Sequence, residues 1–529
     1  MSSVFSAAGI NPRFFRLAAF AMSLFAAAPA LAVDLIYKSS FELGEAPPQA
    51  SWGFNNVTST SIDQVMDSDY RFDAVFVDFN NDGCYDLFVF GHEDPATSRL
   101  WVNRCDGSNT FQFKPNDEVH HYIANPSSPL GAGWMTLLDV NGDGRQDFWL
   151  RHANMLAARY INGTASGVHA PVFADKEDGC DDFCVFGDID GDGTLDVIRY
   201  DRRIERITDR VQLYPAAGTP GRRIVADVNG DGWPDLVQPE SGGYWQNDHG
   251  TLTWQARPAI HANEEPMAMA DLDNSGSMDL ITLDGNEDNG QGRFNLFKND
   301  GSGNFTDVTQ GSGLDQLHFA AWYTGYGNIV VADFDNDGLP DILVAGADYA
   351  PSVTLLHNLG NLHFEVTNVD LGQAGSGSES FKSRAAVADF DNDGRLDVIK
   401  TQAGTNVGLW RNTSNTAGAH WMKARVRGPG LNSDGIGADL KWYQPGTQTL
   451  IAHMTVQANG QHPQTWVHTG LGQNATADLV VRFPHDGQTY TFSALPADQE
   501  VIVYANGCLT QHWTSGSGWP LTAPAGCPN

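Results

Sequence analysis

A nine-residue motif, Asp-x-(Asp/Asn)-x-Asp-Gly-x-x-Asp, recurs through the chain and constrains its fold more than any other feature. Its seven copies start at Asp78, Asp139, Asp188, Asp227, Asp271, Asp333 and Asp389. Successive copies start between 39 and 62 residues apart. That interval is typical of a four-stranded propeller blade whose connecting loops vary in length.

Short apolar segments flank each copy of the motif. They precede it at residues 74–77, 329–332 and 385–388, and they follow it at 87–90, 280–283 and 342–345. Nearly continuous apolar runs of four residues indicate strands that are buried on both faces. An EF-hand needs helices around a twelve-residue loop that ends in Glu, so strands around a nine-residue loop that ends in Asp exclude that reading.

A third strand is predicted after most of the motifs, and a fourth often follows it. The third ends in Asn after an apolar or aromatic pair, as at residues 100–103, 296–299 and 409–412, and the fourth follows a Phe, as at 305–309. The seventh repeat lacks a fourth strand, whereas residues 54–58 resemble one and precede every loop. We therefore expect the N-terminal strand to complete the last blade and close the ring. The predicted fold is all-β, a seven-bladed β-propeller followed by a small β-sandwich-like C-terminal domain.

The residue types in the motif predict calcium sites. Side chains at positions 1, 3 and 5 converge in a tight turn that Gly at position 6 permits, and the carbonyl of position 7 and the carboxylate of position 9 complete an oxygen shell. Hard Ca²⁺ prefers six to eight oxygen ligands of irregular geometry. Two carboxylates about 4 Å apart repel by about 4 kcal/mol at an effective dielectric near 20, and a divalent ion reverses that repulsion.

The predicted ligands, at positions 1, 3, 5, 7 and 9 of each loop, are Asp78, Asn80, Asp82, Cys84, Asp86; Asp139, Asn141, Asp143, Arg145, Asp147; Asp188, Asp190, Asp192, Thr194, Asp196; Asp227, Asn229, Asp231, Trp233, Asp235; Asp271, Asp273, Ser275, Ser277, Asp279; Asp333, Asp335, Asp337, Leu339, Asp341; and Asp389, Asp391, Asp393, Arg395, Asp397.

The seven loops differ in charge. Ser275 replaces the fifth-position Asp of the fifth loop, so we expect the Asp271 loop to be the weakest of up to seven Ca²⁺ sites. Asn80, Asn141 and Asn229 each remove one charge at position 3 but keep an oxygen ligand.

These repeats resemble the FG-GAP or VCBS repeats of integrin α-chain-like propellers. The segment after them resembles the ASPIC/UnbV domain of cartilage-acidic-protein-like chains, through His420 to Val426, Asn432 to Ala438, the Gly470-Leu471-Gly472 triplet and residues 480–484. It departs from that pattern at Phe483-Pro484, where Trp-Pro is usual. The resemblance implies calcium binding and extracellular recognition, and it implies no settled chemistry. The expected divisions are residues 1–32, 33–53 (linker), 54–418 (propeller), 419–504 (ASPIC/UnbV-like domain) and 505–529 (tail).

The N-terminal segment has the sequence features of a secretory signal peptide. Arg13 and Arg16 precede an apolar run that ends at Pro29, and residues 30–32 form a small-x-small cleavage site. An even number of cysteines in an exported chain favours disulfides. Their grouping suggests Cys84–Cys105, Cys180–Cys184 and Cys508–Cys527, with a metal at Cys180 and Cys184 as the alternative.

The net charge and the lack of catalytic motifs limit the functions that are expected for this chain. A net charge of −33 makes nucleic acid an improbable partner, because such a surface repels phosphate. The chain has no second apolar run of membrane-spanning length and none of the common catalytic signatures. We expect a secreted, extracellular or periplasmic, non-catalytic scaffold that binds a glycan or protein ligand. The alternatives are a polysaccharide-active enzyme with a carboxylate pair among Glu118, Glu177, Glu240, Glu264 and Glu265, and a structural subunit of a surface assembly.

Overall fold

The computed structural model describes residues 52–511 with internal gaps. The gaps are 63–70, 92–98, 115–134, 151–157, 163–172, 175–183, 210, 215–219, 263, 285–290, 321–327, 346–352, 368, 370, 372–382, 403–406, 459–465 and 485–487. The predicted signal peptide and residues 512–529 of the tail lie outside the described residues.

Each of the seven repeats forms its own antiparallel sheet, and the Asp-rich loop joins the first two strands of that sheet. The first three sheets comprise β2 (Arg71–Val77), β3 (Asp86–Gly91), β4 (Arg99–Asn103) and β5 (Phe111–Lys114); β6 (Met135–Leu138), β7 (Asp147–Leu150), β8 (Ala158–Asn162) and β9 (Phe173–Ala174); and β10 (Val185–Gly187), β11 (Asp196–Ile198), β12 (Ile204–Arg206) and β13 (Gln212–Tyr214).

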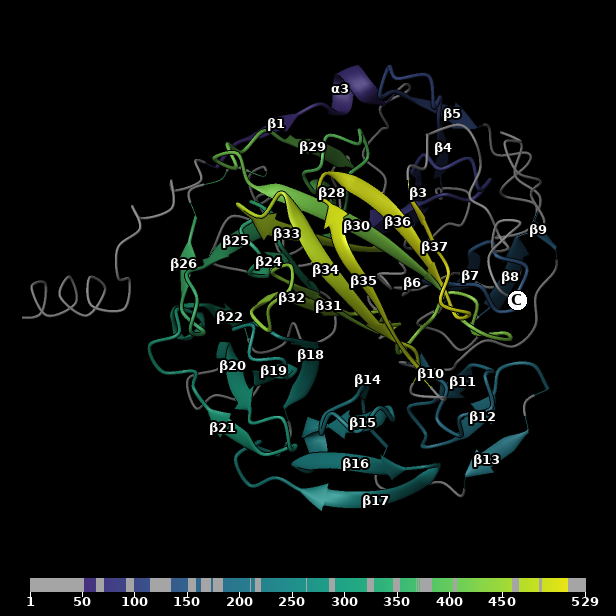
Figure 1. Ribbon diagram of the computed structural model, residues 1–529, viewed down its shortest axis with the longest axis vertical. Coiled ribbons are helices and arrows are strands. Elements are labelled where there is room, and N and C mark those ends of the chain that lie inside the picture. Colours follow the sequence, from purple (N-terminus) through teal and green to yellow (C-terminus); the bar gives the residue numbers. More distant parts are fainter. Residues whose placement is uncertain are drawn as a thin grey trace, which may run out of the picture. The chain divides into compact units, whose positions relative to one another are not determined.

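The next three sheets follow the same order around the molecule (Figure 1). They comprise β14 (Ile224–Ala226), β15 (Asp235–Gln238), β16 (Gly243–Asp248) and β17 (Thr251–Ala256); β18 (Glu265–Ala270), β19 (Asp279–Asp284), β20 (Gln291–Asn299) and β21 (Phe305–Asp307), with β22 (His318–Ala320) also paired to β20; and β23 (Asn328–Ala332), β24 (Asp341–Ala345), β25 (Val353–Asn358) and β26 (Phe364–Val366). Among the described residues the helices are single turns, α3 (Thr58–Ser61), η2 (Pro239–Ser241) and η3 (Leu314–Gln316).

The last sheet combines both ends of the repeat region. Its strands are β27 (Ser383–Ala388), β28 (Asp397–Gln402), β29 (Gly408–Asn412) and the N-terminal β1 (Phe54–Asn56). Phe54 lies opposite Asn412 in the β1–β29 register, so the N-terminal strand pairs with the last repeat and supplies the fourth strand of its sheet, as predicted. The first and last sheets share one apolar cluster that includes Phe76, Trp101 and Phe390, so they pack against each other.

The C-terminal domain is a β-sandwich. One sheet has the order β33 (Trp466–Gly472), β30 (His420–Arg427), β36 (Gln499–Tyr504), β37 (Leu509–Gln511), and the other has β32 (Leu450–Thr455), β31 (Asp439–Tyr443), β34 (Thr476–Arg482), β35 (Thr489–Pro496). The alternating burial of β34 turns Leu479 and Val481 inward, where they share a core with the fully buried Trp442. This architecture confirms the all-β prediction, and the sandwich continues past residue 504 through β37.

One detail of the predicted domain is wrong. Asp-Gly is a sequence typical of β-hairpin turns and predicts a hairpin at Asp434-Gly435, but β30 and β31 on either side of this dipeptide belong to different sheets. The segment is a crossover turn, in which the Asn432 side chain accepts a hydrogen bond from the Ile436 amide at 2.8 Å and donates one to the Ile436 carbonyl at 2.8 Å.

The sandwich and the propeller share a hydrophobic core. The cluster around Trp442 extends to Trp149 and Phe186 of the second and third sheets. In Figure 1 the yellow and green strands of the sandwich cross the middle of the ring of sheets.

A buried asparagine at the end of the third strand joins neighbouring sheets. The Nδ2 of Asn358 donates to the Pro340 carbonyl of its own loop and to the Leu272 carbonyl of the preceding loop, both at 2.8 Å. The same pair of bonds to its own and the preceding loop recurs at Asn162, Asn247, Asn299 and Asn412. Since a buried carbonyl without a donor costs free energy, these residues hold adjacent loops in register.

Replacing one of these asparagines should destabilise the propeller. Asn358→Ala leaves two carbonyls without their hydrogen-bond donor, and we expect it to lower the free energy of unfolding by about 2–6 kcal/mol, at about 1–3 kcal/mol for each unsatisfied group. Urea denaturation measures this change. Asn55→Ala, at an exposed position of β1, is the matched control and should change stability by less than about 0.5 kcal/mol. Equal effects of the two substitutions would contradict the proposed role of the asparagine.

Candidate metal site

Each Asp-rich loop is wound around its own carboxylates. In the third loop Asp188 accepts hydrogen bonds from the Asp192 amide at 3.0 Å and the Gly193 amide at 2.9 Å. Gly193 has φ +81°, in the left-handed region that glycine adopts without steric cost. The ninth-position Asp196 accepts from the Ile189 amide at 2.8 Å. The bond to the ninth carboxylate recurs in every loop. Both bonds to the first carboxylate recur in every loop except the sixth, where the Asp337 amide donates to Asp335 instead.

The fold brings the predicted ligands at positions 1, 3 and 9 together in three loops. Carboxylate oxygens lie within 4.8 Å of one another in the sets Asp188, Asp190, Asp196; Asp271, Asp273, Asp279; and Asp333, Asp335, Asp341. Side-chain oxygens from these three positions can therefore share one cation. The fifth loop belongs to this group despite Ser275, so its carboxylates converge although its charge is reduced.

Two buried carboxylate oxygens in these loops lack a hydrogen-bond donor among the described residues. Asp333 is 3% exposed, and its Oδ2 accepts from the Gly338 and Gly470 amides while its Oδ1 has no partner. Asp196 is fully buried, and its Oδ1 likewise has no partner. An unpaired buried carboxylate oxygen is costly, and a cation is the partner that removes that cost. The donor sets of the third and sixth loops thus fit a calcium ion best.

The fifth-position carboxylates are held in a different way. Where position 3 is Asn, its amide donates to the fifth-position Asp, as Asn80 Nδ2 does to Asp82 at 2.9 Å and Asn229 Nδ2 to Asp231 at 2.8 Å. Asn141 makes the same bond to Asp143 at 3.2 Å. These three loops thus neutralise part of the acidic turn without an added cation.

In the four loops with Asp at position 3, a side-chain cation takes the place of the Asn amide. In each of these repeats a basic residue lies at the same position of the third strand. Arg206 Nη2 lies 3.1 Å from Asp192, Lys298 Nζ lies 2.5 Å from Asp273, and His357 Nε2 lies 3.3 Å from Asp335. Arg411 pairs with Asp391 in the seventh loop. The three loops with Asn have Val102, Ile161 and Gln246 at this position. An additional carboxylate in the loop is thus matched by an additional cation on the strand.

Burial shifts the titration of the ninth-position carboxylates. It raises the pKa of Asp147, Asp196, Asp235 and Asp279 to about 8, and it raises the pKa of Asp86, Asp341 and Asp397 well above the usual value. Burial also disfavours the charged ring of His357, but its hydrogen bonds to Asp335 and Asp337 outweigh that effect and raise its pKa to about 10.

These shifts predict opposite pH responses with and without calcium. A carboxyl group whose folded pKa is raised binds more protons in the folded state, so the metal-free protein should lose stability as pH rises from about 4 to about 8. Calcium needs the ionised carboxylates and competes with their protons, so its stabilising effect should grow over the same range. Melting temperatures at pH 5 and pH 8, each with calcium and with a chelator, measure both trends. A calcium effect that is larger at pH 5 would contradict this account.

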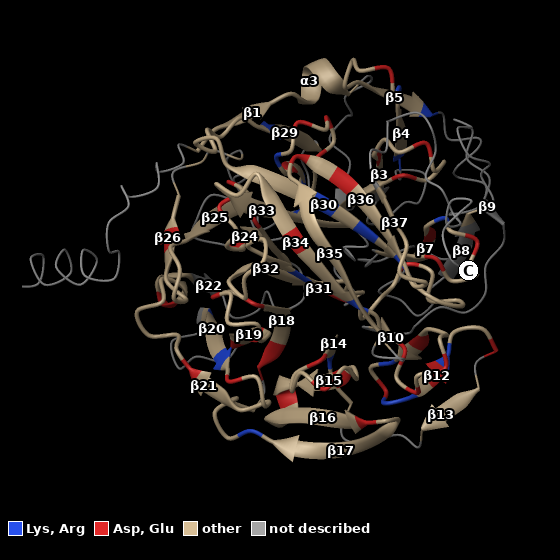
Figure 2. Cartoon of the chain, viewed as in Figure 1, with Lys and Arg blue, Asp and Glu red and all other residues tan. Residues whose placement is uncertain are grey.

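The C-terminal domain packs against the loops with its basic side chains. The five Lys and Arg residues between 419 and 511 are Lys423, Arg425, Arg427, Lys441 and Arg482. Four of them contact the propeller: Arg482 pairs with Asp227, Arg427 and Lys441 donate to the Gly144 and Gly276 carbonyls, and Lys423 lies over the Tyr85 ring. Lys423 and Arg425 also pair with Glu500 and Asp434 of their own domain. Figure 2 shows blue segments on β30, inside a ring of sheets with many red segments. Basic groups thus gather where the acidic loops need counter-charge.

In two loops a cation of the C-terminal domain contacts the first-position carboxylate. Arg482 Nη2 lies 2.5 Å from Asp227 in the fourth loop, and His453 Nδ1 lies 2.9 Å from Asp271 in the fifth. Elsewhere the contact is made by neutral groups, such as the Gly470 amide to Asp333 at 3.0 Å. The fourth and fifth loops therefore already have part of their charge balanced by protein cations.

Removing one of these cations should make the fold more dependent on calcium. Arg482→Gln leaves Asp227 without its counter-charge, so we expect a melting temperature lowered by several degrees in chelator and a smaller loss in saturating calcium. Differential scanning calorimetry measures both values. The control is Arg203→Gln, which removes a half-exposed side chain paired with Asp201 and Glu205. Because Glu205 keeps its ion pair with Arg199, this change should have little effect in either condition. An equal loss for Arg482→Gln with and without calcium would contradict the prediction.

A disulfide bond connects the first loop to the segment after the third strand. Cys84, at position 7, forms a disulfide with Cys105 beyond the third strand, with a Cα–Cα distance of 5.8 Å, as predicted. Cys184 and Cys508 are also disulfide-bonded, and their predicted partners Cys180 and Cys527 lie outside the described residues.

The described candidates for a catalytic pair have structural contacts. Glu264 is buried and accepts hydrogen bonds from the Thr282 hydroxyl and from Asn295 Nδ2, and Glu265 pairs with Arg222. Burial raises the pKa of Glu240. Glu118 and Glu177 lie outside the described residues.

Sequence comparison identifies both parts of the chain. Residues 78–150, 271–344 and 333–399 match the FG-GAP-like repeat, and residues 428–508 match the domain described as ASPIC and UnbV. The chain carries FG-GAP-like repeats and an ASPIC/UnbV domain. Both resemblances expected from the sequence are thereby confirmed.

The curated relatives of this FG-GAP and ASPIC/UnbV chain include cartilage acidic protein 1. The Xenopus tropicalis protein is 22% identical over 355 residues and the Mus musculus protein 23% over 358. Each alignment covers 65% of this chain and 51% of the relative, so the chain spans about half the length of the curated relatives it matches.

Solved structures show only distant likeness. An Agrocybe aegerita lectin that recognises non-reducing terminal N-acetylglucosamine is 18% identical with a TM-score of 0.31, covering 76% of this chain and 86% of the lectin. The V. cholerae biofilm matrix protein Bap1 is 14% identical with a TM-score of 0.25, covering 71% and 69%. Likeness this low carries no information on a ligand. No helix among the described residues has the length and apolar character needed to cross a membrane.

Proposed function

We propose that this protein is a secreted calcium-binding β-propeller scaffold for extracellular recognition or adhesion, and that it does not catalyse a reaction. The observation that carries the proposal is the set of buried, converging carboxylates in the loops, with Asp333 Oδ1 and Asp196 Oδ1 lacking donors among the described residues. A divalent ion would complete these shells.

The position of the loops indicates what calcium would do. The first-position carboxylates of the fourth, fifth and sixth loops contact the C-terminal domain through Arg482, His453 and the Gly470 amide. An ion bound there would fix the turn and the surface on which the domain rests. Calcium is thus proposed to hold the two domains as one rigid unit, and recognition would use the parts of the propeller that the C-terminal domain leaves uncovered.

Metal analysis with a stability measurement tests the proposal. The purified mature chain should contain bound calcium by elemental analysis, and each site should add about 2.7 kcal/mol of stability at a free calcium concentration 100 times its Kd. We therefore expect a melting temperature higher by several degrees in calcium than in chelator. A chain without calcium whose melting is unchanged by chelator would refute calcium binding, and product release from a glycan panel would refute the non-catalytic role.

A further inference from the structure

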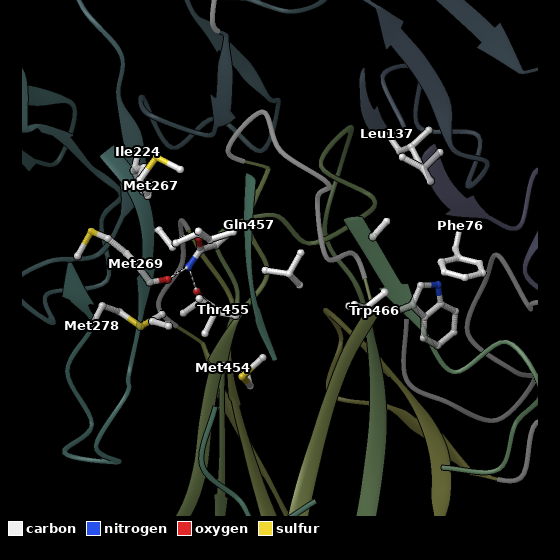
Figure 3. A pocket seen from close by; sticks show the side chains of 18 of the residues that line it. Phe76, Leu137, Ile224, Met267, Met269, Met278, Met454, Thr455, Gln457 and Trp466 are labelled. Atoms are coloured by element: carbon white, nitrogen blue, oxygen red, sulfur yellow. Dashed lines mark hydrogen bonds between the residues drawn. The ribbon is translucent and has the colours of Figure 1, made fainter. Parts of the chain in front are cut away.

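A cavity lies between the innermost propeller strands and the C-terminal domain. Its volume is about 170 Å³, and its walls come from β2, β14, β18, β23 and β27 on the propeller side and from β32 on the other. Figure 3 shows side chains of both domains around the space, with Met267 and Met269 on one side and Trp466 on the other.

The lining is rich in thioether and aromatic groups. Four methionines, Met267, Met269, Met278 and Met454, contribute to it together with Trp466. The chain has 10 methionines in 529 residues, so four of them at one cavity is a strong concentration. Methionine side chains are flexible and polarisable, make favourable contacts with aromatic rings and adapt to ligands of varied shape.

Three polar side chains of the wall, His453, Thr455 and Gln457, form hydrogen bonds within the protein. His453 uses Nδ1 toward Asp271 and Nε2 toward Asp439, and the Gln457 amide donates to the Met269 carbonyl at 3.1 Å and to the Thr455 hydroxyl at 2.6 Å. A charged or polyhydroxylated molecule would lose its hydration here without gaining equivalent bonds. The cavity therefore selects against sugars and ions.

We propose that this cavity binds a small neutral apolar molecule of about the size of one aromatic ring. An apolar cavity of about 150 Å³ lined by aliphatic and aromatic side chains stays dry and takes up benzene or xenon, and the space here is of that size. The ligand would contact Met269 of the propeller and Met454 of the C-terminal domain at once. Because it binds only when both walls are in place, it favours the docked arrangement of the two domains.

Fluorobenzene is a suitable probe, followed by ¹⁹F NMR on the calcium-loaded full chain. We expect saturable broadening of its signal, together with a change in Trp466 fluorescence. Ala268→Phe places a ring in the space from β18 and should weaken binding at least tenfold. Met422→Leu changes a methionine of the sandwich core that is not part of the lining and should leave binding unchanged.

Two independent variants that fill the cavity, Ala268→Phe and Met267→Trp, decide the outcome. Circular dichroism checks that each is folded, and Met267→Trp fills the same space if Ala268→Phe does not fold. Absence of saturable binding up to the solubility of fluorobenzene would overturn the proposal, as would unchanged binding in a folded filling variant. Loss of binding in a folded filling variant with retention in Met422→Leu would support it.

Discussion

The structure depends on how buried carboxylates are compensated. Each of the seven repeats places a fully or nearly fully buried Asp at the ninth motif position, where removal from water disfavours its charged form. Backbone amides supply part of the compensation, since the ninth-position Asp accepts from the amide of position 2 in every loop, as Phe79 donates to Asp86. Side-chain cations and the proposed calcium ions supply the rest.

The compensation of the loop carboxylates by side-chain cations follows the same pattern across the repeats. Asp190, Asp273, Asp335 and Asp391 at position 3 occur with Arg206, Lys298, His357 and Arg411 on the third strand, and loops with Asn at position 3 have an uncharged residue there. The C-terminal domain adds a second layer of cations. Protein cations therefore offset part of the negative charge of these loops, and the proposed calcium ions would offset the remainder.

Much of this architecture could be predicted from the sequence because its signals are local and repeated. Apolar runs on both sides of each motif predict the first two strands, and the similarity of residues 54–58 to a fourth strand correctly predicts the pairing of Phe54 with Asn412. The convergence of positions 1, 3 and 9 follows from the geometry of one turn. Occupancy by calcium stays a prediction.

Features that depend on distant contacts could not be predicted in the same way. Nothing near Arg482 or His453 in the sequence indicates that these residues contact Asp227 and Asp271, because the contacts arise only when the sandwich packs on the propeller. The Asp434-Gly435 turn was misread because turn chemistry does not reveal whether the flanking strands share a sheet. An Asn recurs at the end of the third strand in most repeats, and this pattern was a signal for the bridging role of Asn358. The pattern does not reveal the second hydrogen-bond partner of Asn358, which lies 86 residues away in the sequence.

The pairing of β1 with β29 has a consequence for the order in which the propeller folds. The amide of Gly53 bonds to the hydroxyl of Ser414, 361 residues later, so the last sheet cannot be finished until nearly the whole repeat region has been synthesised. Closing so long a segment costs conformational entropy before any contact rewards it, and non-local pairing of this kind slows folding. Although β1 precedes every other described strand in the sequence, it is thus among the last to find its place, and the last sheet lacks its edge strand until then.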